Sequence, residues 1–222
     1  MTLMAMAMPA RMRLVLASNN AGKLAELRQL FAPLALELVP QPELGLPEAD
    51  EPHATFIENA LAKARHAAHA SAGAALADDS GLCVDALGGA PGVISAHYAS
   101  IAMPAGDREA RRKLQDAANN ALLLQRLAGA SDRRASFVCT LVALRSADDP
   151  QPLVVSGRWQ GEILTTPRGE GGFGYDPLMF IPKLGATVAE LPRELKNTHS
   201  HRALACRQML QLMRDGWRLP IA

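Results

Sequence analysis

Cysteine is scarce in this sequence, and the three that occur are far apart. Cys83, Cys139 and Cys206 make an odd number and show none of the short spacings of a zinc site. Disulfide-stabilised domains and structural zinc sites both need cysteines at close, paired spacings. The pattern argues against both and favours a reducing compartment, so we expect a cytoplasmic protein.

The sequence also lacks an excess of charge of one sign and any long apolar run. It carries 23 basic and 22 acidic side chains, a formal net charge of +1. Proteins that bind nucleic-acid polymers concentrate positive charge on one face, because phosphate neutralisation supplies much of their affinity. No stretch approaches the roughly 20 apolar residues of a membrane span. We therefore expect neither a nucleic-acid polymer nor a membrane as partner.

The first eleven residues are rich in Met and Ala, but they lack a basic start followed by a long apolar run. They do not resemble a signal peptide, and we predict a disordered extension over 1–11. The chain has 222 residues, 49% of them hydrophobic, which suffices to bury a full core as one large domain or two small lobes. We expect a single domain over 12–222.

Short apolar runs alternate with stretches of helical periodicity. The patterns predict strands over 13–17, 74–77, 136–144, 153–159 and 178–181. They predict helices over 23–31, 56–68, 108–127 and 195–213. Helices that alternate with strands, together with one antiparallel hairpin, indicate an α/β fold with a mixed sheet.

The first candidate site is the turn Ser18-Asn19-Asn20-Ala21-Gly22 with Lys23, between a strand and a helix. Free backbone N–H groups and the positive end of the dipole make a helix N-terminus a favourable place for phosphate. Lysine is unfavourable there unless an anion is bound. The next residue is Leu24, so the hydroxyl of a Walker A loop is missing. A solvated lysine after an ordinary turn is the alternative.

The second candidate is Asp78-Asp79-Ser80-Gly81, which we place at the end of a strand. Ligand sites of open α/β sheets lie beyond the carboxyl ends of strands. Successive strand side chains alternate between faces, so one of the two carboxylates is expected to enter a given site. It could hold Mg²⁺ or deprotonate a water. A plain Asp-Ser-Gly turn is the alternative.

The third candidate is the polar side of the helix that Thr55 caps. Asn59 and Lys63 are four residues apart and project from one face, and Glu51 lies just before the helix. Together they could present an acid and a base to one cavity. A solvated helix face is the alternative.

Two weaker candidates lie in the C-terminal third. The loop 169–177 places Phe173 and Tyr175 among glycines, where a backbone can approach a ligand closely and an aromatic ring can stack on a base. Lys196 and the run Ser200-His201-Arg202 supply donors suited to carbonyl or phosphate oxygens. A packed turn and solvated basic residues are the respective alternatives.

Taken in this order, the motifs resemble the inosine/xanthosine triphosphate pyrophosphatase family. The resemblance extends from Met12 to about Gly216. Its landmarks are Ser18-Asn19-Asn20-Ala21-Gly22-Lys23, Thr55-Phe56-Ile57-Glu58-Asn59-Ala60, Ala77-Asp78-Asp79-Ser80-Gly81-Leu82, Gly88-Gly89-Ala90-Pro91-Gly92, Gly171-Gly172-Phe173-Gly174-Tyr175-Asp176-Pro177 and Ser200-His201-Arg202. Each motif is weak alone, and the shared order carries the resemblance.

The resemblance implies two lobes around a long mixed sheet flanked by helices, a nucleotide cleft between the lobes, and a homodimer. It implies a small-molecule substrate, a nucleoside triphosphate such as dITP, ITP or XTP, which is cut to the monophosphate and pyrophosphate with Mg²⁺. Asp79 would be the catalytic acid–base and a metal ligand, and Glu51 a second metal ligand. The implied substrate-binding residues are Ser18, Asn19, Asn20, Ala21, Gly22, Lys23 and Lys63 for phosphate, Ser80, and Phe173, Gly174, Tyr175, Asp176, Lys196, His201 and Arg202 for the purine.

Two positions depart from the family pattern. Asn19 stands where many relatives have glycine, and His97 replaces a common arginine. Two other functions stay open at this point. One is a related pyrophosphatase for pyrimidine or modified nucleotides, and the other is a nucleotide-binding module without turnover.

Overall fold

The computed structural model describes residues 12–102 and 105–219, so the predicted extension over 1–11 lies outside the described residues. One seven-stranded mixed sheet has the strand order β2-β1-β3-β4-β5-β6-β7. The strands are β1 (Met12–Ala17), β2 (Leu36–Pro40), β3 (Ala74–Val84), β4 (Arg134–Leu144), β5 (Leu153–Ile163), β6 (Met179–Ile181) and β7 (Ala186–Thr187). The α-helices are α1 (Ala21–Phe31), α2 (Phe56–Ser71), α3 (Arg108–Arg126), α4 (Arg193–His199) and α5 (His201–Trp217).

The order in which strands are added to the sheet reverses at β1, which lies between β2 and β3 and runs parallel to both. The connection through α1 leads to β2 on one side, and the connection through α2 leads back to β3 on the other. Crossovers between parallel strands are right-handed, so α1 and α2 cover opposite faces of the sheet. Ligands of such sheets bind outside the carboxyl ends of the strands at this reversal. Here that place is where Ala17 of β1 pairs with Ala77 of β3.

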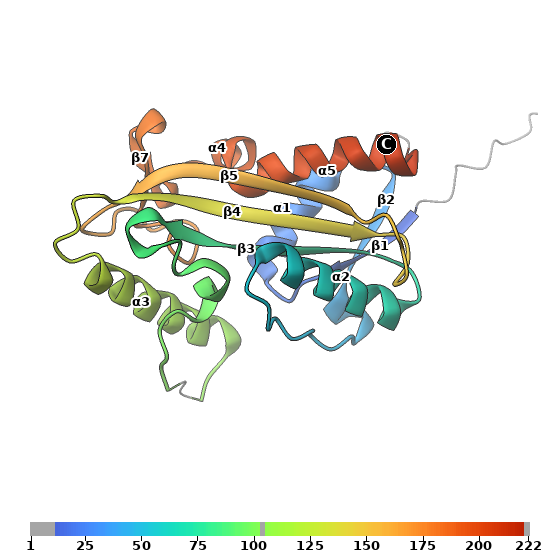
Figure 1. Cartoon of the computed structure of the whole chain (residues 1–222), viewed down its shortest axis with the longest axis horizontal. Coiled ribbons are helices and arrows are strands. Elements are labelled where there is room, and N and C mark those ends of the chain that lie inside the picture. The colour runs from blue at the N-terminus through green and yellow to red at the C-terminus, as the bar shows by residue number, and fades with distance from the viewer. Residues whose placement is uncertain (1–11, 103–104, 220–222) are drawn as a thin grey trace, which may run out of the picture.

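Two apolar layers, one on each face of the sheet, pack the helices against the strands. One layer packs Leu27 and Phe31 of α1 and Met209 of α5 against Leu14 and Leu76 of the sheet. The other packs a row of alanines of α2 (Ala60, Ala64, Ala67 and Ala68) against Val15, Ala75 and Ala77. Figure 1 shows the long strands β3, β4 and β5 between α5 and α2, with α3 at the opposite end of these strands from α2. Small side chains let α2 approach the sheet closely, which brings its polar residues near β3.

Most predicted elements are confirmed. The hairpin of β4 and β5 is antiparallel, as expected, and Asp107 caps α3 through the N–H groups of Glu109 and Ala110. The α/β fold with a mixed sheet is therefore confirmed. Strands β2 and β7 were not predicted. Both are short and show no clear strand pattern in the sequence. Their strand conformation is evident only from pairing, of β2 with β1 and of β7 with β6.

Three local predictions were wrong. The aspartate doublet does not lie at the end of its strand, because β3 continues through it to Val84 and pairs with β4 along that length. The apolar pattern of the predicted helix 56–68 also predicts that Ile57 is buried, but this residue is 51% exposed. The predicted helix 195–213 is broken at Ser200, whose hydroxyl caps α5 by accepting from Ala203 N–H. Among the helices that the structure describes, none has the length and apolarity that crossing a bilayer requires.

Candidate active site

The turn after β1 forms the N-terminus of α1. Asn20 is the N-cap, and its Oδ1 accepts a hydrogen bond of 3.2 Å from the backbone N–H of Lys23. The hydroxyl of Ser18 accepts one of 3.3 Å from the N–H of Asn20. Ala21 and Gly22 lie in the first turn, which contains no acidic residue. The first N–H groups of a helix have no partner within it, so this end of α1 is suited to an anion.

Asn19 has a different position. Its Oδ1 accepts a hydrogen bond of 3.1 Å from Nε2 of Gln41, a buried residue just after β2. This contact ties the turn to the neighbouring strand through a side chain that glycine would lack. In this structure, Asn19 therefore holds the shape of the turn.

The two aspartates of β3 meet lysines from opposite faces of the sheet. Nζ of Lys23, on α1, lies 2.8 Å from Oδ2 of Asp78. Nζ of Lys63, on α2, lies 3.4 Å from Oδ1 of Asp79. The alternation of strand side chains thus sends one carboxylate to each helix. The turn that carries Lys23 and the aspartate doublet therefore lie next to each other.

Asp78 is enclosed by positive charge. Ser80 donates a hydrogen bond of 2.9 Å to its Oδ2, and Nη2 of Arg202 lies 3.8 Å from the same oxygen. Burial pushes the pKa of Asp78 up, but Lys23, Arg202 and Lys63 outweigh that effect and hold the pKa well below its usual range. Its Oδ1 is buried and has no hydrogen-bond partner among the described residues. Asp78 is therefore a permanently charged anchor for the surrounding cations.

Asp79 has the opposite electrostatic environment. Burial raises its pKa to about 6, and the nearby charges of Glu51 and Asp78 add to this, while Lys63 and Lys23 oppose it. Asn59 donates a hydrogen bond of 3.3 Å to its Oδ2. A carboxyl with a pKa near neutrality can both accept and release a proton under ordinary conditions.

Helix α2 assembles the groups around Asp79. Asn59 is fully buried and also bonds both backbone groups of His53, which holds the segment that carries Glu51. Lys63 lies 3.0 Å from Glu51 and bridges it to Asp79. Burial lowers the pKa of Lys63, but Asp78, Asp79 and Glu51 together raise it above its ordinary value. The expected shared face of Asn59 and Lys63 is thus present and directed at Asp79.

The glycine-rich loop lies against the N-terminus of α1. A Cβ placed on Gly22 would come within 3.3 Å of the ring of Phe173. Asp176 is buried, accepts a hydrogen bond of 3.0 Å from the N–H of Phe173, and lies 2.9 Å from Nζ of Lys196. The hydroxyl of Tyr175 donates to the carbonyl of Ser95, and its ring is part of the core. Phe173 is thus the aromatic ring of this loop that faces the candidate site.

The basic residues after β7 form a buried ion cluster. Arg202 is 2% exposed and pairs with Glu26 of α1, and Lys196 lies 3.3 Å from the same residue. His201 stacks on Phe137 at 5.0 Å between ring centroids. Its pKa is well below the usual range because it is buried and lies near Arg202 and Lys196, so the imidazole is neutral. Among the described residues, neither Nδ1 of His201 nor Nε of Arg202 has a hydrogen-bond partner.

Helix α3 contributes site residues that the sequence reasoning missed. Nη1 of Arg112 donates a hydrogen bond of 2.9 Å to Oδ1 of Asn20. The carboxylate of Asp116 accepts a hydrogen bond from the N–H of Gly174, and the side-chain amide of Asn120 donates one to the carbonyl of Gly174. Arg112, Asp116 and Asn120 are spaced four residues apart, which in a helix places them on one face, and the sequence alone could have shown this shared polar face. Nothing in the sequence connected that face with the turn near residue 20.

The carboxylates of the candidate site show whether the residues present could hold Mg²⁺. Among the described residues, no group of three His, Cys, Asp or Glu side chains has the arrangement of a metal site. Mg²⁺ commonly binds through one or two carboxylates, with waters and substrate phosphates as its other ligands. Glu51 and Asp79 form such a pair, since Nζ of Lys63 lies 3.0 Å from Glu51 and 3.4 Å from Asp79 and so brings the two carboxylates together. The residues present therefore fit this ion.

Fold and site together define an α/β protein with paired lysines and buried carboxylates at the point where the strand order of its sheet reverses. Comparison with known proteins narrows this class. The model of the Ham1 family matches residues 14–212. A dITP/XTP pyrophosphatase of Methylibium petroleiphilum is 72% identical over 206 residues, 93% of this chain and 99% of the relative. One of Leptothrix cholodnii is 67% identical over 94% of this chain and 100% of the relative.

Solved structures agree with the sequence comparison. A HAM1 protein from Coxiella burnetii superposes with a TM-score of 0.82 at 42% identity, covering 92% of this chain and 99% of that one. The Staphylococcus aureus Ham1 protein gives a TM-score of 0.77 at 36% identity, with the same coverage. The chain belongs to the Ham1 family. The family resemblance inferred from the motifs is thereby confirmed.

Proposed function

We propose that this chain hydrolyses non-standard purine nucleoside triphosphates, dITP and XTP among them, to the nucleoside monophosphate and pyrophosphate. The names of its close relatives support this substrate class. The observation that carries the proposal is the pairing of Lys23 with Asp78 and of Lys63 with Asp79, just beyond the carboxyl end of β1, where β3 continues past its neighbour. Two lysines and two carboxylates of different pKa at a helix N-terminus suit phosphate binding and proton transfer at one place.

The N-terminus of α1 would bind the triphosphate. The hydroxyl of Ser18 and the N–H groups of the first helical turn would donate to phosphate oxygens, and Lys23 and Lys63 would neutralise charge. Both lysines are already oriented by buried carboxylates. Such preorganised cations stabilise the charge that develops on departing pyrophosphate without rearranging during the reaction.

Asp79 would act as the general base. Its ionised carboxylate accepts a proton from a water, and the oxygen of that water attacks the α-phosphorus as the bond to the pyrophosphate oxygen breaks. Asn59 would keep the carboxylate oriented through its hydrogen bond to Oδ2. Glu51 and Asp79 would hold Mg²⁺, which supplies Lewis-acid stabilisation of phosphate charge when it is bound.

The ring of Phe173 would stack on the purine, next to the ion cluster of Lys196 and Arg202. Nε–H of Arg202 lacks an acceptor among the described residues, and a carbonyl oxygen at position 6 of hypoxanthine or xanthine would supply one. Adenine has an amino group there, so donor would face donor. A buried donor left unpaired disfavours the wrong base by about 1–3 kcal/mol.

We also propose a cytoplasmic location and a homodimer. All three cysteines are free thiols in the structure, which fits a reducing compartment. The homodimer rests on the family resemblance, and light scattering on the purified chain would test it directly. A monomeric mass at micromolar concentration would refute it.

A product assay tests the proposed function. The purified chain with Mg²⁺ is given dITP, XTP, dGTP, dTTP and dUTP separately, and pyrophosphate is distinguished from orthophosphate. We expect pyrophosphate from dITP and XTP, slow turnover of the others, and loss of activity in EDTA. Preference for a pyrimidine would overturn the substrate assignment, and binding of ITP without pyrophosphate release would overturn catalysis.

A further inference from the structure

Arg112 differs from the other cations of the candidate site in having no acidic partner. Lys23 is paired with Asp78, Lys63 with Glu51, Lys196 with Asp176, and Arg202 with Glu26. Among the described residues, no carboxylate oxygen lies within ion-pair distance of the Arg112 guanidinium, and its single hydrogen bond goes to the neutral amide of Asn20. Its positive charge is therefore available to a ligand.

The acceptor that Arg112 uses shows where that ligand would bind. Oδ1 of Asn20 accepts 2.9 Å from Nη1 of Arg112 and 3.2 Å from the backbone N–H of Lys23. One oxygen atom thus lies within reach of both the guanidinium and the helix N-terminus. A phosphate oxygen that took the N–H of Lys23 would also be within reach of Arg112. Being charged, it would accept more strongly than an amide oxygen does.

Helix α3 holds Arg112 in place for this contact. Asp116 and Asn120 bond both backbone groups of Gly174, which fixes α3 to the loop that carries Phe173. The guanidinium lies 4.7 Å from the centroid of the Phe173 ring. Such stacking orients a guanidinium and removes part of its hydration, while its edge stays free to donate.

We propose that Arg112 is a further substrate-binding residue, which exchanges the amide oxygen of Asn20 for a phosphate oxygen of the bound triphosphate. This inference rests on the proposed function for the identity of the substrate. It assigns to α3 a cation that holds phosphate together with the N-terminus of α1. His97, the position where the family arginine is missing, lies in the turn Gly92–His97 that α3 packs against.

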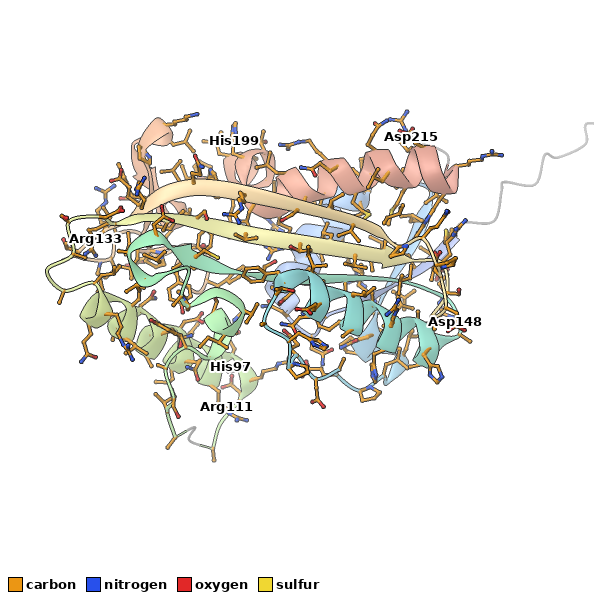
Figure 2. All side chains as sticks on the ribbon, viewed as in Figure 1. His97, Arg111, Arg133, Asp148, His199 and Asp215 are labelled. Atoms are coloured by element: carbon orange, nitrogen blue, oxygen red, sulfur yellow. The ribbon has the colours of Figure 1, made fainter. Side chains whose placement is uncertain are left out.

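The test uses inorganic tripolyphosphate, which carries the phosphates without the base. Its dissociation constant in Mg²⁺ is measured for the wild type, Arg112→Ala, Arg112→Lys and a matched control, Arg111→Ala. Arg111 is exposed on the same helix, at the lower edge of the view in Figure 2. We expect Arg112→Ala to bind about 10- to 100-fold more weakly, as the loss of a charge-assisted hydrogen bond predicts. Arg112→Lys should recover most of the affinity, and Arg111→Ala should match the wild type.

Two controls separate this inference from folding and from the proposed function. The melting temperature of Arg112→Ala should stay within about 3 °C of the wild type, because one partly exposed hydrogen bond is lost. Tripolyphosphate binding does not depend on turnover, so failure of the wild type to hydrolyse dITP would refute only the proposed function. Equal affinities of Arg112→Ala and Arg111→Ala, or equal weakening by Ala and Lys, would overturn the role of Arg112.

Discussion

Asp78 and Asp79 are adjacent on β3, yet they face opposite sides of the sheet and have opposite pKa shifts. Asp78 lies 2.8 Å from Lys23 of α1, and its pKa is held well below the usual range by that lysine, Arg202 and Lys63 against the effect of burial. Asp79 faces α2, and burial raises its pKa to about 6. Two titratable groups whose pKa values are pushed apart mark different chemical roles. Here they separate a charged anchor from a proton acceptor.

Replacing Asp79 by Asn should remove most activity and leave the fold intact. The amide keeps the shape of the side chain but can neither accept the proton of water nor neutralise a cation. Loss of a general base typically costs about 10²–10⁴-fold in rate. The measurement is kcat for dITP in saturating Mg²⁺. Asp148→Asn, in the exposed loop between β4 and β5 (Figure 2), is the control and should be fully active. Near-normal turnover in Asp79→Asn would place the base elsewhere.

The same substitution should stabilise the metal-free protein at neutral pH. The pKa of Asp79 is higher in the folded chain, about 6, than its ordinary 3.8. The folded state therefore binds this proton more tightly than the unfolded state does. Its ionisation costs on the order of 1–3 kcal/mol of stability above pH 6, and this cost fades as the pH falls through 6 towards 4.

Thermal unfolding in EDTA tests whether ionised Asp79 destabilises the metal-free protein. Asp79→Asn should melt about 2–6 °C above the wild type at pH 7.5, with a smaller difference at pH 5. Added Mg²⁺ should raise the melting temperature of the wild type more than that of the variant, because the ion binds the carboxylate only in the folded state. A variant that is less stable than the wild type at pH 7.5 would show that Asp79 contributes net stability.

Replacing Lys23 by Ala should weaken both substrate binding and stability. Asp78 would keep Arg202 nearby but lose its closest cation, and a buried carboxylate with reduced compensation costs about 1–3 kcal/mol. The KM for dITP should rise at least about tenfold through the lost phosphate contact. Lys113→Ala is the control, because that lysine is 75% exposed on α3. An unchanged KM would remove Lys23 from the phosphate site.

Replacing Gly81 by Ala should destabilise the fold. A Cβ there would overlap the carbonyl oxygen of Gly92 and lie 2.5 Å from the hydroxyl of Ser95. Both neighbours belong to a turn packed on β3, and overpacking of this kind costs about 1–3 kcal/mol. Gly73→Ala is the matched control, since the nearest atom to its Cβ would be 3.7 Å away. Equal melting temperatures of the two variants would show that the turn yields easily.

The sequence identified the site better than it identified the details of the elements around it. The cap Thr55 and the helices over 23–31 and 108–127 could be predicted from the sequence because caps and helical periodicity are local properties. The extension of β3 through Asp78 and Asp79 was not readable, because pairing with β4 holds that segment extended against the turn preference of Asp-Ser-Gly. Ser200 likewise interrupts a periodic helix pattern, because its hydroxyl caps α5, and the apolar periodicity does not reveal that break.

By itself, the sequence determined which chemical groups are present, the α/β alternation, and a motif order that pointed to the family. Tertiary structure alone decided which lysine meets which aspartate, how Glu26 joins Lys196 and Arg202, and that Arg112 reaches a residue 92 positions away. The physical reason is that pattern and propensity act over a few residues of chain. Charge pairing and pKa depend on distance and burial, which exist only once the sheet brings its strands together.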